Sequence, residues 1–309
     1  MWYDFHCDVL YKLWMNKSLS YQSSDELDIN LNRLKRSEAR LQTFALFVVE
    51  EDVPSPQQFD VVLEMIEQYR RQVLACPEMK PIVSKNDLAQ LQTGDIGAFL
   101  TLEGCDAIGQ SLTRLQTLIQ LGVRSVGLTW NFANAVADGV GEPRAAGLTL
   151  FGREVVHHLN QEKCWIDVSH LAEPGFWEVM ERGDVVWASH CNARALADHP
   201  RNLSDEQIKA LFQKDGVIGV NFVPDFLRTD QRATINDVLR HIDHMLNLGG
   251  EDHVMIGSDF DGIDEKTIGL ETYDGMRALK DQFQKHWGKD LVEKLMHRNA
   301  HRFMETYLP

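Results

Sequence analysis

The chain has 309 residues, and its 46 acidic side chains outnumber its 31 basic ones, which gives a formal charge of −15 with histidine neutral. This excess of negative charge excludes a general nucleic-acid binder, because binding to phosphates requires an excess of Lys and Arg. Apolar residues make up 44% of the chain and charged residues 25%, which excludes the disordered and fibrous classes. We therefore expect a globular protein with a large core.

The cysteines and the first residues indicate the cellular compartment of the protein. The five cysteines are odd in number and scattered along a large chain, so we expect free thiols rather than a disulfide framework. The opening residues lack the basic and apolar segments of a signal peptide, and no apolar run approaches the roughly 18 residues that span a bilayer. We therefore expect a cytoplasmic protein that does not bind membranes.

Short apolar runs alternate with longer segments of helical spacing, which is the pattern of βα units around a parallel sheet. No linker rich in Pro, Gly or Ser divides them. The predicted elements in chain order are a strand over 2–7, a loop with a short helix over 16–40, a strand over 41–49, a helix over 59–74, a strand over 96–103, a helix over 112–121, a strand over 124–130, a helix over 150–161, a strand over 164–170, a helix over 174–182, a strand over 185–190, a helix over 203–213, a strand over 217–222, a helix over 235–248, a strand over 253–259, and helices over 273–283 and 289–307. Eight strands interleaved with helices predict an α/β fold, a single (β/α)8 TIM barrel of the metallohydrolase type that spans residues 1–309 as one domain.

Two of the predicted helices carry start signals. Ser204 and Gln207 have the spacing of a capping box. Thr234 directly precedes an apolar stripe that begins at Ile235, and Gly249 follows the end of that stripe.

Polar residues that can bind metals stand at the carboxyl ends of the predicted strands, where apolar core residues would otherwise continue. In a TIM barrel these ends meet at one mouth, where the active sites of this fold lie. Each residue alone has an ordinary alternative, such as a helix cap for Asp8, an exposed loop for Glu103 or a turn for Asp261. The candidates are His6, Asp8, Glu103, His170, His190 and Asp259.

Three histidines and three carboxylates form a mixed donor set. Such a set suits Zn²⁺ better than the all-oxygen shells of Mg²⁺ and Ca²⁺. It is also larger than one tetrahedral ion requires, and two-metal sites hold their ions about 3.5 to 4 Å apart to activate water and polarise an electrophile. The sequence therefore predicts a metal-dependent hydrolase.

These motifs, in this order, resemble those of the membrane (renal) dipeptidase family of zinc metallopeptidases, bacterial members included. The resemblance covers nearly the whole chain. The motifs that carry it are His6-x-Asp8, Leu102-Glu103-Gly104, Leu128-Thr129-Trp130-Asn131 with Ala137-Asp138, Asp167-x-Ser169-His170, Ser189-His190, Arg201-Asn202 and Gly257-Ser258-Asp259-Phe260-Asp261-Gly262.

The resemblance implies a role for each residue that matches a family motif. It implies a dipeptidase with two Zn²⁺ per chain, one bound by His6 and Asp8 and the other by His170 and His190. Glu103 would bridge the two ions, and a hydroxide between them would attack the peptide bond. Asp259 would then act as general base and acid, and Arg201 would bind the C-terminal carboxylate of a small peptide substrate. Peptides of the form L-Xaa-D-Xaa are among the substrates that the family accepts, and a homodimer is expected on the same resemblance.

Trp130 departs from the family pattern, because family members with dipeptidase activity have a histidine at this position. That histidine is thought to bind the substrate carbonyl, and an indole N–H can donate a hydrogen bond but cannot carry charge. Asn131 and Asn134 follow on the same loop and are candidate donors. Phe222 or Phe226, after the seventh predicted strand, could form an apolar wall of the substrate pocket.

Three functions follow from these observations. The first is a zinc dipeptidase. The second, suggested by Trp130, is a related two-metal hydrolase of a non-peptide amide, a lactam or a lactone. The third is a non-catalytic barrel that binds peptides, and the presence of the full ligand set together with Asp259 argues against it.

Overall fold

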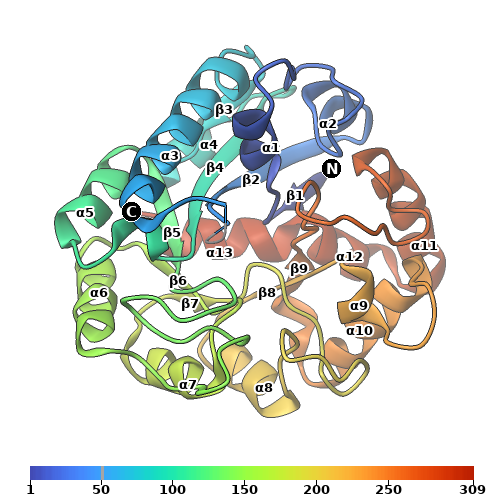
Figure 1. The fold of residues 1–309 in the computed structure, drawn as a ribbon. Coiled ribbons are helices and arrows are strands. Elements are labelled where there is room, and N and C mark those ends of the chain that lie inside the picture. The colour runs from blue at the N-terminus through green and yellow to red at the C-terminus, as the bar shows by residue number, and fades with distance from the viewer. Residues whose placement is uncertain (50–51) are drawn as a thin grey trace.

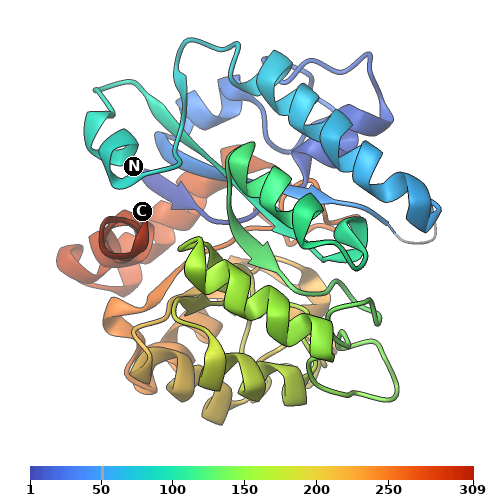
Figure 2. The same cartoon turned by 90° about the vertical axis from the view of Figure 1, so that its left-hand side faces the viewer.

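Parallel strands lie at the centre of the molecule, and helices surround them (Figures 1 and 2). The computed structural model describes residues 1–49 and 52–309. The barrel strands are β1 (Trp2–Asp4), β2 (Ala39–Phe47), β4 (Ile96–Glu103), β5 (Val123–Gly127), β6 (Trp165–Asp167), β7 (Val186–Trp187), β8 (Ile218–Val220) and β9 (Val254–Ile256). They are hydrogen-bonded in the order β7-β6-β5-β4-β2-β1-β9-β8, and an isolated parallel bridge between Ala188 and Ile218 joins the two ends. The predicted TIM barrel is therefore confirmed as a nearly closed barrel of eight parallel strands.

Helices follow most of the strands and cover the outside of the barrel (Figure 1). They are α1 (Val9–Met15), α2 (Leu31–Arg36), α3 (Ser55–Gln68), α4 (Lys85–Gln90), α5 (Leu112–Gln120), α6 (Leu150–Gln161), α7 (Glu173–Arg182), α8 (Asp205–Gln213), α9 (Pro224–Leu227), α10 (Ile235–Asn247), α11 (Met276–His286), α12 (Lys289–Glu293) and α13 (Asn299–Tyr307). Both predicted helix starts are confirmed, since Ser204 and Thr234 each form a capping box. Within the described residues, no helix has the length and apolar character needed to cross a membrane.

The structure also contains elements that the sequence pattern did not predict. The short strand β3 (Met79–Pro81) pairs with β4 outside the barrel order, and α1, α4 and α9 were not predicted. Helix α1 has no side-chain hydrogen bond at its cap residue Asp8, so its start carries no capping signal. Several strands also end earlier than predicted, because the chain leaves the barrel before it reaches the polar residues of the mouth.

The amino-terminal end of the barrel is closed by aromatic side chains and by the last helix. Phe5, Phe99, Trp165 and Trp187 are all fully buried inside the barrel, and they form one cluster with Phe303 of α13. The Trp165 ring lies 5.0 Å from the Phe99 ring, 5.4 Å from the Trp187 ring and 4.8 Å from the Phe303 ring. Helix α13 crosses this end of the barrel, at the back in Figure 1. The aromatic floor, as we call these five residues, leaves the opposite end of the barrel free for chemistry.

Candidate metal centre and active site

The structure brings all six predicted site residues together at the carboxyl-terminal mouth of the barrel. Glu103 is the last residue of β4, and the other five follow the ends of β1, β6, β7 and β9 by two to four residues. All six side chains are buried or nearly so, the most exposed being Asp259, whose side chain is 12% exposed. Burying so many ionisable groups is costly unless they pair with one another or bind a metal.

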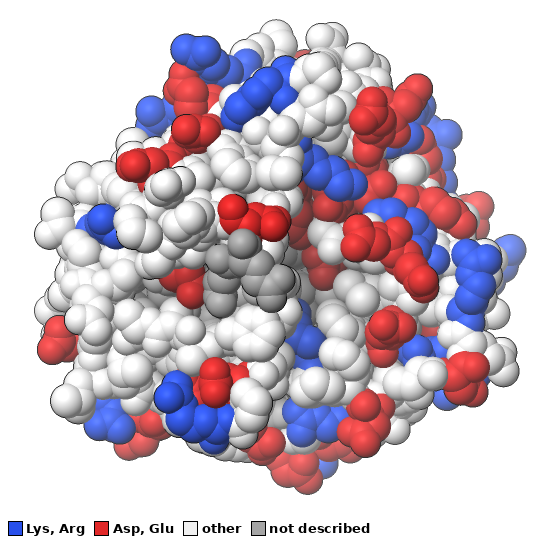
Figure 3. Space-filling model, in the orientation of Figure 1, with Lys and Arg blue, Asp and Glu red and all other residues white. Residues whose placement is uncertain are grey.

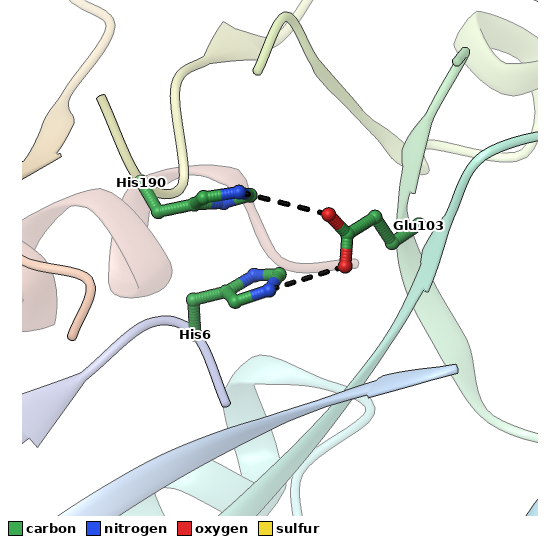
Figure 4. Close-up of side chains that lie close together, drawn as sticks. All are labelled: His6, Glu103 and His190. Carbon is green, nitrogen blue, oxygen red and sulfur yellow. Dashed lines mark ion pairs between the residues drawn. The ribbon is translucent and has the colours of Figure 1, made fainter. Parts of the chain in front are cut away.

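The carboxylate of Glu103 lies between two sets of ligands. Its Oε2 is 3.2 Å from Nε2 of His6, which in turn is 3.5 Å from Oδ2 of Asp8. Its Oε1 is 2.9 Å from Nε2 of His170 and 3.6 Å from Nε2 of His190. Figure 4 shows the imidazoles of His6 and His190 pointing at the two oxygens of this carboxylate. Each oxygen of Glu103 therefore faces its own set of donors, which is the arrangement that a bridging carboxylate needs.

Several observations show that this donor set fits metal ions. Two groups have donor atoms that all lie within 4.8 Å of one another: His6 with Glu103 and His190, and His6 with Asp8 and Asp259. Among the described residues, Oδ1 of Asp8 is buried without a hydrogen-bond partner, and the buried Nε2 of His6 forms no hydrogen bond of regular geometry although Glu103 lies 3.2 Å away. Buried polar atoms are rarely left without a partner, so atoms like these need an explanation, and a bound ion is one. Nitrogen and carboxylate donors in this combination suit Zn²⁺ and similar ions.

The environment sets the protonation state of each imidazole. Burial, helped by the charge of Arg201, lowers the pKa of His170 to about 4, and burial lowers the pKa of His190 well below its ordinary value. Both are therefore neutral at neutral pH, which is the form that binds metals. Burial also opposes the charged form of His6, but Glu103 and Asp8 outweigh it and raise the pKa of His6 well above its ordinary value. The carboxylates thus favour a positive charge at this point.

The carboxylates differ in a corresponding way. Burial alone would raise the pKa of Glu103, but His6 and His170 outweigh it and hold that pKa well below the ordinary value. At Asp8 the charge of His6 does not offset burial, so the pKa of Asp8 is raised well above the ordinary value. Glu103 is therefore the carboxylate that the surrounding imidazoles hold ionised, as its central position requires.

Unusual backbone conformations aim two of the candidate site residues. His170 and Asp259 have φ angles of 66° and 68°, in the left-handed region that residues other than glycine rarely adopt. Such residues cost about 1–3 kcal/mol each and occur where the surroundings hold them, often at functional sites. Gly262 makes room for the carboxylates, because a Cβ at this position would lie 2.2 Å from Oδ2 of Asp8 and 2.6 Å from Oδ1 of Asp259.

Residues of the sequence motifs to which no metal-binding role was given hold the imidazoles that follow β6 and β7 in place. Nδ1 of His190 lies 2.7 Å from Oγ of Ser189, and that hydroxyl donates to Oδ2 of Asp167. Nδ1 of His170 lies 2.9 Å from Oδ1 of Asn131. Partners of this kind fix the ring orientation and leave Nε2 free for a metal. Asn131, predicted as a substrate-binding residue, therefore also contacts a predicted metal ligand.

Asp259 is oriented by a residue of the neighbouring strand. Nδ2 of Asn221, which follows β8, donates to Oδ2 of Asp259 over 2.8 Å. Oδ1 of Asp259 lies 3.9 Å from Nε2 of His6, a candidate metal ligand. Sequence analysis could not identify this role of Asn221, because the hydrogen bond joins two residues that are 38 positions apart along the chain.

The candidate site residues lie at a cleft with a volume of about 840 Å³. Asp8, Glu103, His170 and Asp259 line it together with Trp130 and Asn131. Figure 3 shows the hollow near the centre of this face, with acidic side chains gathered on its right. The predicted Phe222 is fully buried against Phe260, with ring centres 5.7 Å apart, and the structure does not bring it to the cleft. Its alternative, Phe226, does line the cleft.

Arg201 lines the same cleft on the side of β7 and β8. It is only 5% exposed, and its guanidinium lies 5.3 Å from the centre of the Phe226 ring. Within residues 1–49 and 52–309, no carboxylate forms an ion pair with Arg201, and its buried Nε has no hydrogen-bond partner. A buried cation without an anionic partner is costly, so this position is suited to a ligand carboxylate.

Comparison with known proteins assigns the chain to a family. Residues 1–307 match the model of the membrane dipeptidase family, peptidase family M19. An uncharacterised protein from the pqqA 5′ region of Klebsiella pneumoniae is 38% identical over 219 residues, which cover 66% of this chain and 80% of that protein. The uncharacterised dipeptidase C965.12 of Schizosaccharomyces pombe is 32% identical over 266 residues, which cover 78% of this chain and 62% of that protein.

Solved structures agree with this assignment. The crystal structure of dipeptidase AC, a metallopeptidase of family M19, superposes with a TM-score of 0.93 at 29% identity, covering 99% of this chain and 98% of that one. A metallopeptidase from Rhodobacter sphaeroides, liganded with a phosphinate mimic of the dipeptide L-Ala-D-Ala, gives a TM-score of 0.92 at 28% identity and covers 99% of both chains. The chain belongs to the membrane dipeptidase family, M19, and is a metallopeptidase that hydrolyses the peptide bond of dipeptides.

Proposed function

We propose that the protein is a two-zinc dipeptidase that accepts dipeptides with an L- or a D-residue at the C-terminal position. The observation that carries the proposal is the position of Glu103, whose two oxygens face His6 with Asp8 on one side and His170 with His190 on the other. Four protein ligands around one shared carboxylate suit two ions rather than one. The related enzyme from Rhodobacter sphaeroides, bound to a mimic of L-Ala-D-Ala, supports the D-residue.

The residues of this chain would divide the reaction among them. When bound, the metals would polarise the scissile carbonyl and lower the pKa of the attacking water. Arg201 would bind the C-terminal carboxylate and so place the peptide bond over the ligands. Asn221 holds Oδ2 of Asp259, which leaves Oδ1 to take a proton from the attacking water and then give it to the departing amine.

Metal analysis combined with hydrolysis tests this proposal. We expect about two zinc ions per chain in the purified protein, together with turnover of both L-Xaa-L-Ala and L-Xaa-D-Ala dipeptides. Asp259→Asn should retain the metals and lose turnover. Two zinc ions with no turnover of any dipeptide would contradict the substrate, and absence of metal would contradict the site.

A second test concerns the recognition of the carboxylate. Arg201→Ala should raise KM for dipeptides much more than it lowers kcat, while Arg153→Ala, on α6 and paired with Glu178 at 3.0 Å, should change neither. A dipeptide amide lacks the carboxylate, so the wild-type protein should hydrolyse it poorly and Arg201→Ala should no longer discriminate against it. Equal hydrolysis of the dipeptide and its amide by the wild-type protein would remove Arg201 from the proposal.

Trp130 favours a second candidate, a related two-metal hydrolase of a non-peptide amide, a lactam or a lactone. The indole lines the cleft with its ring centre 6.2 Å from that of His170. If Trp130→His raises dipeptidase activity, the native specificity has diverged from dipeptides. If it lowers that activity, the indole serves dipeptide hydrolysis. We further propose that the protein acts in the cytoplasm as a homodimer, which fractionation and light scattering would test.

A further inference from the structure

The wall of the cleft opposite Arg201 is aromatic. The Trp130 ring lies 5.0 Å from the Phe47 ring, which lies 5.6 Å from the Tyr11 ring. All three residues line the cleft and are only partly buried, unlike the aromatic floor. These contacts make one continuous surface, which we call the aromatic wall, that runs from the metal ligands outwards. Aromatic faces that stay accessible inside a cleft are a common means of binding apolar and planar groups.

The barrel topology places the Phe47 and Tyr11 part of this wall across the mouth from Arg201, whereas Trp130 follows β5, which only β6 separates from β7. Phe47 ends β2, Arg201 lies on the loop after β7, and three strands separate β2 from β7 in either direction around the closed order. Tyr11 belongs to α1, beside β2. A dipeptide whose carboxylate contacts Arg201 and whose peptide bond lies over the ligands must therefore direct its N-terminal residue towards β1 and β2.

The aromatic wall is held in position by its surroundings. The Tyr11 hydroxyl donates to Oδ2 of Asp52 over 2.9 Å. The backbone of Trp130 is enclosed by the following loop, since a Cβ at Gly139 would lie 2.2 Å from the carbonyl oxygen of Trp130. Nearby, Nζ of Lys12 is paired with Asp261 at 2.9 Å, so its charge is compensated. A wall that is fixed before the substrate binds loses little conformational entropy on binding.

We infer that the aromatic wall of Tyr11, Phe47 and Trp130 selects dipeptides whose N-terminal residue carries an aromatic side chain. This inference rests on the proposed dipeptidase function and on its orientation of the substrate by Arg201. A ring at that position would pack against Phe47 and Trp130, and the other end of the cleft offers a cation to the carboxylate. The direction in which the dipeptide binds along the cleft is thus set by charge at its C-terminal end and by aromatic contact at its N-terminal end.

The test compares three dipeptides with the metal-loaded full-length protein. L-Phe-L-Ala and L-Ala-L-Phe have the same composition in opposite order, and L-Ala-L-Ala lacks the ring. We expect kcat/KM for L-Phe-L-Ala to exceed that of both others by at least about tenfold. Phe47→Ala should reduce this preference for L-Phe-L-Ala over L-Ala-L-Ala to about threefold or less. Phe226→Ala removes an aromatic ring on the Arg201 side of the same cleft, and it should leave the ratio of L-Phe-L-Ala to L-Ala-L-Ala as in the wild type.

The outcomes separate this inference from the function on which it rests. Equal hydrolysis of the three dipeptides, or a preference for L-Ala-L-Phe, overturns the inference and leaves the dipeptidase function standing. A preference that survives Phe47→Ala also overturns it. Should Phe47→Ala fail to fold by circular dichroism, Phe47→Leu and Tyr11→Leu provide the same test, because both keep bulk and remove the ring. If the zinc-loaded protein hydrolyses none of the three peptides, both the inference and the proposed dipeptidase function are overturned.

Discussion

The two ends of the barrel are built on opposite principles. The aromatic floor at the amino-terminal end contains five fully buried rings that pack on one another and need no ion or substrate. The mouth buries six ionisable side chains, two of them on left-handed backbone. Apolar burial stabilises the fold, whereas buried charges and strained backbone cost stability unless a ligand compensates them. The floor therefore holds the fold that allows the mouth to keep a costly arrangement.

The largest effect on stability is expected at the aromatic floor. Trp165→Ala would leave a cavity between Phe99, Trp187 and Phe303, and a change of this kind in a core costs about 3–5 kcal/mol in the free energy of unfolding. Denaturant unfolding would measure it. Trp177→Ala, at a position that is 41% exposed, should change this free energy by no more than about 0.5 kcal/mol. Loss of metal from folded Trp165→Ala would show that the two ends are not independent.

A pH-dependent effect is expected at His241 of α10, which joins two loops of the mouth. Its Nδ1 accepts from the backbone N–H of Ala193 and its Nε2 donates to the carbonyl oxygen of Leu227, each over 3.0 Å. Burial lowers the pKa of His241 to about 4. In the unfolded chain, His241 binds a proton near pH 6.5, whereas in the folded protein it does so only near pH 4. The free energy of unfolding is therefore highest above pH 6.5 and falls as the pH drops from 6.5 to 4.

The titration of His241 lowers the free energy of unfolding by about 3 kcal/mol between pH 7 and pH 4. Comparing the free energy of unfolding of the wild type with that of His241→Gln at pH 7 and pH 4 isolates it, because Gln can form both hydrogen bonds without titrating. The variant should lose about 3 kcal/mol less than the wild type over this range. Equal losses in both proteins would mean that His241 binds its proton in the folded state as well.

The mouth and the floor also differ in how far the sequence predicts them. The candidate ligands could be brought together from the sequence because each ends or follows an apolar strand, and the carboxyl ends of all barrel strands meet at one mouth. The partners that orient them could not, since Asn131 and His170 are 39 residues apart and belong to different units. The floor depends on a hydrogen bond from the Trp165 indole to the backbone carbonyl of Tyr307, which is 142 residues away along the chain. The alternation of residues along a strand cannot predict such a contact. Phe222 stands at the carboxyl end of the seventh predicted strand, where residues of a cleft are expected, but its ring packs on Phe260 instead.

At the mouth, a single methyl group should separate metal binding from folding. Gly262→Ala would place a Cβ against the carboxylates of Asp8 and Asp259, which must then move. We expect a loss of at least about 100-fold in kcat/KM, as for other small displacements of reacting groups, and a lower metal content. Gly288→Ala, where a Cβ meets nothing within 4 Å, is the control. Full activity in Gly262→Ala would mean that the carboxylates tolerate displacement.

The smallest effect is expected one step away from the ligands, at Asn131. Its Oδ1 accepts from Nδ1 of His170, which keeps the proton on that nitrogen and turns Nε2 towards Glu103. Asn131→Ala should weaken metal affinity by about tenfold, the lower end of what such supporting residues contribute, with little change in stability without metal. Asn131→Asp keeps the acceptor and should retain most of the affinity. Competition with a chelator would measure both variants, and equal weakening in the two would show that Asn131 supports the loop rather than the imidazole.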